Sequence, residues 1–166
     1  MNIQEILSKL SVREKAVLCV SGDQLCTAAL PDRGIPRLVM TDGTTGVRIL
    51  KTPPTPPETA QFRTAITASF DSPEALAGTE EATCFPAGSS LACSCDPSLA
   101  EEIGAAVAAE CRALGAGVLF GPGLNTRRSP LDGRGFEYYS EDAVLAGDMT
   151  AGYVKGLQDH GVGACV

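Results

Sequence analysis

A charged loop follows an apolar run in the second half of the chain. Residues 120–142 read FGPGLNTRRSPLDGRGFEYYSED and contain three arginines and four acidic side chains. Arginine donates hydrogen bonds to hydroxyl oxygens and carboxylates accept them, so this composition suits a neutral polyhydroxyl ligand. The alternative is that the charges only pair with one another to hold a long loop, which would involve Arg128, Asp132, Arg134 and Glu137.

A second polar group, Asp42, ends the apolar run IPRLVMTDG at residues 35–43, which predicts a buried strand. The run GVLFG predicts another strand directly before the charged loop, and GVGACV predicts a third at residues 161–166. Helical segments between the strands favour a parallel α/β sheet. Ligands bind at the carboxyl ends of such strands, so Asp42 and the charged loop should share one rim.

Two long helices are expected to position this rim. In the first, Asp96 is the predicted N-cap, Pro97 the first residue and Gly115 the stop, with a buried stripe of Leu99, Ile103, Val107, Cys111 and Leu114. In the second, Ser140 or Asp142 is the cap and Gly161 the end, with a buried face of Leu145, Met149, Tyr153 and Leu157.

The first half of the chain is less regular. A helix is expected around residues 2–10, and Ser11 and Glu14 form a capping box that predicts a second one. Residues 50–84 are rich in proline and predict a long surface excursion with a helical turn at residues 73–76.

Several common site types do not fit this sequence. GPGLNT lacks the third glycine of a dinucleotide motif, and GSS at residues 88–90 does not match the G-x-S-x-G of serine hydrolases. Cys93 and Cys95 form only a C-x-C pair, and the single histidine, His160, fits a helix end, so no metal site is expected. The seven cysteines are expected to be reduced and to serve as small core side chains.

Length and charge set the class of protein. The 166 residues suit one domain, and the net charge of −7 disfavours nucleic acid and anionic membranes as partners. No apolar run is long enough to span a membrane, and the N-terminus has no secretory h-region. We therefore expect a soluble, cytoplasmic protein.

Two stretches of the chain resemble motifs of one enzyme family. TDGTTGVR, residues 41–48, resembles the D-G-P-x-G-[LV]-R motif of glycoside hydrolase family 3 β-glucosidases, and residues 121–142 resemble the family block G-P-x-x-N-x-x-R-x-P-x-G-G-R-N-F-E-x-x-S-E-D. SVREKAVLCVSG, TCFPAGSSLACSCDPSLAEEIG and VKGLQDHGVGACV also fall in the family's order. The resemblance covers most of the chain outside the proline-rich segment.

The resemblance implies a fold and roles for particular residues. Residues 1–166 would form a single partial domain, the N-terminal half of a (β/α)8 TIM-type barrel. Asp42 and Arg134 would bind hydroxyls of the terminal glucose, while three residues would brace the site, namely Arg48, Arg128 and Glu137. Thr44, Gly135 and Asp132 depart from the family pattern, which has proline, asparagine and a small residue there.

The activity implied by the resemblance is retaining hydrolysis of β-D-glucosides. It requires two carboxylates about 5 to 5.5 Å apart, one as nucleophile and one as acid/base. The family's Lys-His pair, nucleophile and acid/base have no counterpart here, so the chain is expected to be either a fragment or a truncated gene product. It is expected to be inactive alone and to associate with the rest of the barrel or with itself. No cofactor is implied. The alternatives are a noncatalytic carbohydrate-binding half-barrel and a phosphate- or nucleotide-binding α/β domain.

Overall fold

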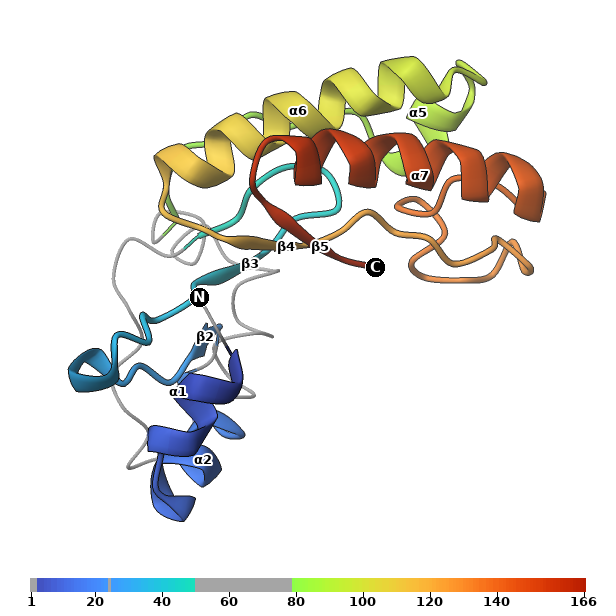
Figure 1. Cartoon of the computed structure of the whole chain (residues 1–166). Coiled ribbons are helices and arrows are strands. Elements are labelled where there is room, and N and C mark those ends of the chain that lie inside the picture. Colours follow the sequence, from blue (N-terminus) through green and yellow to red (C-terminus); the bar gives the residue numbers. More distant parts are fainter. Residues whose placement is uncertain (1–2, 24, 50–78) are drawn as a thin grey trace. The chain divides into compact units, whose positions relative to one another are not determined.

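The computed structural model of the chain describes three stretches, residues 3–23, 25–49 and 79–166. The chain divides into two compact units (Figure 1). Of the described residues, unit 1 comprises 3–23, 25–39 and 79, and unit 2 comprises 40–49 and 80–166. Every strand that carries a predicted site residue, and both long helices, belong to unit 2.

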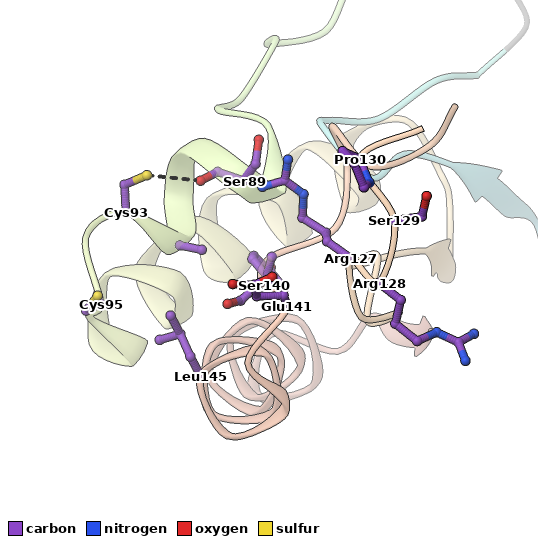
Figure 2. A pocket seen from close by; sticks show the side chains of 12 residues that line it. Ser89, Cys93, Cys95, Arg127, Arg128, Ser129, Pro130, Ser140, Glu141 and Leu145 are labelled. Atoms are coloured by element: carbon purple, nitrogen blue, oxygen red, sulfur yellow. Dashed lines mark hydrogen bonds between the residues drawn. The ribbon is translucent and has the colours of Figure 1, made fainter. Parts of the chain in front are cut away.

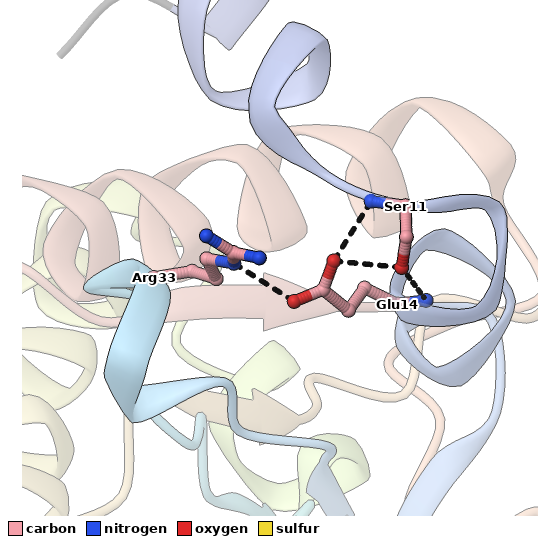
Figure 3. A network of polar contacts seen from close by, with 3 residues as sticks. All are labelled: Ser11, Glu14 and Arg33. Atoms are coloured by element: carbon pink, nitrogen blue, oxygen red, sulfur yellow. Dashed lines mark hydrogen bonds and ion pairs between the residues drawn. The ribbon is translucent and has the colours of Figure 1, made fainter.

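Unit 1 begins with two short helices, α1 (Ile3–Lys9) and α2 (Val12–Leu18). The predicted capping box is confirmed, because the Glu14 amide donates to Ser11 Oγ at 3.2 Å and the Ser11 amide donates to Glu14 Oε2 at 2.7 Å. Arg33, in the short 3-10 helix η1 (Pro31–Arg33), donates from Nε to Glu14 Oε1 at 2.8 Å (Figure 3). Chiefly through Arg33, and then through Ser11, these contacts lower the pKa of Glu14 to about 2.

The rest of unit 1 differs from the sequence prediction. It contains an antiparallel pair that the sequence pattern does not indicate, β1 (Ser21–Asp23) and β2 (Cys26–Thr27). The strand predicted over residues 35–43 is wrong for most of its length, since only its end, at residues 40–42, forms a strand. Pro36 has no amide hydrogen, and Ile35 forms an antiparallel bridge back to Leu30.

Unit 2 contains a parallel sheet of β3 (Met40–Asp42), β4 (Val118–Phe120) and β5 (Gly163–Cys165), in the order β3-β4-β5. The predicted parallel pairing of these segments is confirmed. Their register places Asp42 beside Phe120 and Phe120 beside Cys165. The carboxyl ends of all three strands therefore lie along one edge of the sheet.

One face of this sheet is covered by two long helices that lie side by side, α6 (Pro97–Ala113) and α7 (Ala143–Asp159) (Figure 1). Leu119 is fully buried in the core that these helices form, and Ala164 packs against the same core. Side chains alternate between the faces of a strand, so the row of Asp42, Phe120 and Cys165 belongs to the opposite face.

The helix ends follow the sequence prediction closely. Asp96 caps α6 by accepting from the Ser98 amide at 2.9 Å, and Asp142, not Ser140, caps α7 by accepting from the Val144 amide at 2.7 Å. Gly115 and Gly161 follow the helices with φ values of 77° and 79°, in the left-handed region that favours glycine.

The predicted stripe of α6 is confirmed except at Leu99: Val107 and Cys111 are buried, and Ile103 and Leu114 pack against the core. Leu99 is 38% exposed, whereas the face that packs inward consists of Ala100, Gly104, Val107, Ala108 and Cys111. Close approach of the two helix backbones explains the difference: a Cβ on Gly104 would lie 2.3 Å from the Tyr153 carbonyl oxygen, and one on Gly156 would lie 2.1 Å from that of Glu101. Only small residues fit such a contact, so the leucine lies outside it. On α7 the predicted face holds, with Met149, Tyr153 and Leu157 buried.

Other expectations of the sequence need correction. The short helix α5 (Gly88–Ala92) is absent from the sequence prediction, and most of the proline-rich segment, including the expected turn at residues 73–76, lies outside the described residues. The prediction that the cysteines are core side chains is wrong for five of the seven, because these five are exposed: Cys19, Cys84, Cys93, Cys95 and Cys165.

Within the described stretches, no helix has the length and apolar character to cross a membrane.

Candidate functional site

Asp42 is the last residue of β3 and lies half-buried on the sheet face that the helices leave uncovered. The Gly43 amide donates to its Oδ1 at 3.0 Å. This contact orients one carboxylate oxygen toward the backbone of the turn. The carboxylate can still accept further hydrogen bonds from a ligand, because each oxygen has more than one acceptor position.

The ends of β3 and β4 meet backbone to backbone. A Cβ on Gly43 would lie 2.2 Å from the Gly46 carbonyl oxygen and 2.8 Å from Cδ1 of Leu119, so no larger residue fits there. A Cβ on Gly121 would lie 3.1 Å from the Gly43 carbonyl oxygen. The two glycines allow the loop after β3 and the loop after β4 to start in close contact. The peptide bond between Gly121 and Pro122 is cis.

A buried carboxylate connects these two loops. Glu137 is 6% exposed, and each of its carboxylate oxygens accepts a hydrogen bond. Arg134 donates from Nε to Oε1, and Thr44 donates from Oγ1 to Oε2 at 2.7 Å. Two of the charges in the loop after β4 therefore do pair with each other, and the pair also reaches the turn that follows Asp42.

The Arg134 side chain is 69% exposed, although its Nε is engaged by Glu137. The hydrogen bond to Glu137 is the main cause that raises the pKa of Arg134, followed by the negative charge of Glu137. The charge of Asp42 adds a smaller contribution in the same direction. The turn after Asp42 is connected to Arg134 through the hydrogen bonds that Thr44 and Arg134 donate to Glu137, and the guanidinium stays positive.

The residues predicted to brace the site differ in position. Arg48 acts through its backbone: its amide donates to the Asp42 carbonyl at 3.0 Å, and its own carbonyl accepts from Thr41 Oγ1 at 2.6 Å. Glu137 forms the link described above. Arg128 instead lines an open cavity of about 650 Å³ that includes neither Asp42 nor Arg134 in its lining.

The cavity that Arg128 lines lies between α5, the loop at residues 127–130 and the start of α7 (Figure 2). Its lining mixes two arginines and Glu141 with serine hydroxyls, two thiols and apolar side chains. Cys93 Sγ donates to the Ser89 carbonyl, as Figure 2 shows. No three potential metal ligands gather in any part of the chain that the structure describes.

Sequence reasoning missed the role of Thr44. In the sequence it stands out only because it replaces the proline of the resembling motif. Its partner, Glu137, lies 93 residues further along the chain, so no local pattern could connect the two.

Comparison with known proteins places these features in a family. The model of the glycosyl hydrolase family 3 N-terminal domain matches residues 57–166. The chain belongs to this family. Among curated relatives, thermostable β-glucosidase B of Acetivibrio thermocellus is 39% identical over all 166 residues, and probable β-glucosidase J of Aspergillus fumigatus (strain Af293) is 40% identical over 160 residues, or 96% of the chain.

Solved family 3 structures agree with the fold. β-Glucosidase 3B from Thermotoga neapolitana, in complex with glucose, matches 97% of the chain at 36% identity and a TM-score of 0.77. The β-glucosidase from Kluyveromyces marxianus, also with glucose, matches 99% at 35% identity and a TM-score of 0.81. The 166 residues cover only part of these relatives. They span 20% and 16% of the length of the two curated relatives, and 22% and 17% of the length of the two solved ones.

Proposed function

We propose that these residues form the sugar-positioning part of a retaining β-glucosidase that hydrolyses terminal β-D-glucosyl residues. Asp42 accepts hydrogen bonds from sugar hydroxyls, and the free guanidinium nitrogens of Arg134 donate to the same sugar. The observation that carries the proposal is geometric: Arg134 and Thr44, which follows Asp42 by two residues, donate to the two oxygens of one buried carboxylate, Glu137.

The chemistry of the site supports this assignment. A carboxylate and a guanidinium side by side offer acceptors and donors to a ligand that carries both in each hydroxyl group. Holding the sugar in a reactive orientation contributes several kcal/mol of barrier lowering in well-oriented systems, roughly 7–11 kcal/mol at most. The curated relatives named above are β-glucosidases, and both solved relatives named above hold glucose.

The nucleophile and the acid/base of this reaction are proposed to lie outside residues 1–166. Both carboxylate oxygens of Glu137 are already engaged within the protein. Asp142 and Asp96 cap helices, which commits their carboxylates to backbone amides. Retaining hydrolysis needs a carboxylate that is free to attack the anomeric carbon and another that can exchange a proton.

We further propose that β3, β4 and β5 are strands of a closed (β/α)8 barrel. In such a barrel, helices cover the outside and the inner strand faces line the interior. The covered and uncovered faces of the present sheet fit this arrangement. Asp42 would then lie at the carboxyl-terminal mouth, where barrel enzymes bind their substrates.

The test is hydrolysis of a chromogenic β-glucoside by the complete protein that contains these residues. Asp42→Asn and Arg134→Gln should each lower kcat/KM by about 100-fold, since each removes a charge-assisted hydrogen bond to the positioned sugar. Asp148→Asn on α7 and Arg112→Gln on α6 make the same charge changes at exposed positions and should leave kcat/KM unchanged.

Full activity in both site variants would refute the assignment of Asp42 and Arg134. Glucose binding that depends on Asp42 without any hydrolysis would favour the noncatalytic carbohydrate-binding alternative. Stabilisation by a nucleotide and not by glucose would refute the carbohydrate site altogether.

A further inference from the structure

Glu137 is the side-chain link between the two loops that carry Asp42 and Arg134. Its carboxylate is buried, so each oxygen needs a hydrogen-bond donor to offset the loss of water. One donor, Arg134, comes from the loop after β4, and the other, Thr44, comes from the loop after β3. The positions of the two loops are therefore coupled through a single carboxylate.

The backbone between Thr44 and Asp42 is closely held. They are separated only by Gly43, whose amide is bound to Asp42 Oδ1 and whose α-carbon has no room for a side chain. The carbonyl of Asp42 is fixed in addition by the Arg48 amide at 3.0 Å. A displacement of Thr44 is consequently transmitted to the carboxylate of Asp42.

Glu137 itself is held independently of Thr44. Its carbonyl oxygen lies so close to Gly88 and Gly123 that a Cβ on either glycine would approach to 2.3 Å or 2.7 Å. The Glu137 amide also donates to the Arg134 carbonyl at 3.1 Å. Loss of the Thr44 hydroxyl should therefore leave the loop after β4 folded and release mainly the turn that carries Asp42.

We propose that Thr44 is a positioning residue of the sugar site, which acts through Glu137 to set the spacing between the Asp42 carboxylate and the Arg134 guanidinium. This inference rests on the proposed function. Threonine carries the hydroxyl that this link requires, whereas the proline of the resembling motif cannot donate a hydrogen bond from its side chain. The coupling is thus a property of this chain's own sequence.

The experiment compares three variants of the complete protein with β-glucoside substrate and with glucose as inhibitor. Thr44→Val keeps the shape and removes the hydroxyl, Thr44→Ala removes both, and Thr44→Ser keeps the hydroxyl. Both variants without the hydroxyl should raise KM and the glucose inhibition constant by about tenfold and lower kcat by a smaller factor, because the lost hydrogen bond holds a group that both binds and orients the sugar. Thr44→Ser should retain wild-type values.

A second readout separates positioning from general stability. Wild type, Thr44→Val and Thr44→Ser should unfold cooperatively, and Thr44→Val should add no further increase in KM when Asp42→Asn is already present. An unchanged KM in Thr44→Val, or equal losses in the valine and serine variants, would overturn the inference. If Asp42→Asn and Arg134→Gln are themselves without effect, the proposed sugar site is wrong as well. If they are impaired and Thr44→Val is normal, only the role of Thr44 is wrong.

Discussion

At the residue scale, Glu14 shows how nearby hydrogen-bond donors lower the pKa of a surface carboxylate. Arg33 and the amide and hydroxyl of Ser11 all donate to it, and together they lower its pKa from 4.5 to about 2. A carboxylate whose pKa is lower in the folded state stabilises that state once it is ionised. Its contribution is fully present above the unfolded pKa and disappears as the pH falls through the folded one.

We therefore expect Glu14→Gln to destabilise the protein most at pH 5 and above. The difference in free energy of unfolding between wild type and variant should shrink as the pH falls from about 4.5 toward about 2, because Glu14 becomes protonated in both states. Urea unfolding of both proteins between pH 2.5 and pH 7 measures this difference. A constant difference across that range would contradict the role given to the charge.

Sequence motifs single out Asp42 and Arg134 as candidate site residues, but they give no indication of the role of Thr44. Asp42 and Arg134 stand out because each lies in a short motif next to a recognisable strand. Thr44 and Glu137 form their hydrogen bond across 93 positions, and only the folded arrangement of β3 and β4 brings them together. Arg128 lines the cavity between α5 and the start of α7, and its predicted role in bracing the loop stays a prediction.

At the element scale, α6 and α7 pack closely against each other. Besides Gly104 and Gly156, a Cβ on Gly152 would lie 2.2 Å from the Pro97 carbonyl oxygen. Lys155 supports the contact at the surface, donating to Glu101 at 2.6 Å and to Asp159 at 2.7 Å. The obstacles are backbone atoms, which cannot rotate away as a side chain could.

Gly156→Ala should therefore destabilise the protein by about 1–3 kcal/mol, as overpacking of a fixed contact does. Gly147→Ala is the matched control in the same helix, since nothing lies within 4 Å of the place that its Cβ would take. It should stabilise by about 0.5–1 kcal/mol through the higher helix propensity of alanine. Thermal and urea unfolding measure both, and equal effects of the two substitutions would contradict the close helix contact.

The same helices explain what sequence patterns predict well at this scale. Asp96, Asp142, Gly115 and Gly161 are predictable as helix ends because capping depends on a few neighbouring residues. The exposure of Leu99 and the burial of Ala100 and Gly104 on α6 are not predictable in this way, because they depend on the distance to α7, which periodicity does not contain. The strand at β3 is shorter than its apolar run suggests, since Ile35 pairs back with Leu30 instead of continuing into the sheet.

At the scale of the whole molecule, the proposed sugar site lies on the sheet face that the helices leave uncovered, because Asp42 is on that face. β3 and β5 each have one neighbour among the described strands, so each leaves one side open to further pairing. We propose that the rest of a barrel occupies these sides, and that residues 1–166 on their own self-associate through them. In this proposal residues 1–166 position the substrate, and residues outside this segment cleave the glycosidic bond.

The 166 residues purified alone should accordingly show no hydrolysis of a chromogenic β-glucoside, while the complete protein that contains them should be active. The reason is that Glu137, Asp142 and Asp96 already accept hydrogen bonds within the protein, whereas retaining hydrolysis needs two carboxylates that are free to act on the sugar. The assay includes Asp42→Ala of the same 166 residues. Turnover that this substitution abolishes would show that the catalytic carboxylates lie within this segment.

His160 is the only histidine of the chain and directly follows α7, where its Nδ1 lies 2.9 Å from the carbonyl oxygen of Gly156. Gly156 is also one of the residues at which α7 closely approaches the backbone of α6. Proton resonances of a lone imidazole are separated from the rest of an NMR spectrum and need no assignment by mutagenesis. The 166 residues purified alone therefore carry a native spectroscopic reporter of the helix contact, one that needs no introduced label.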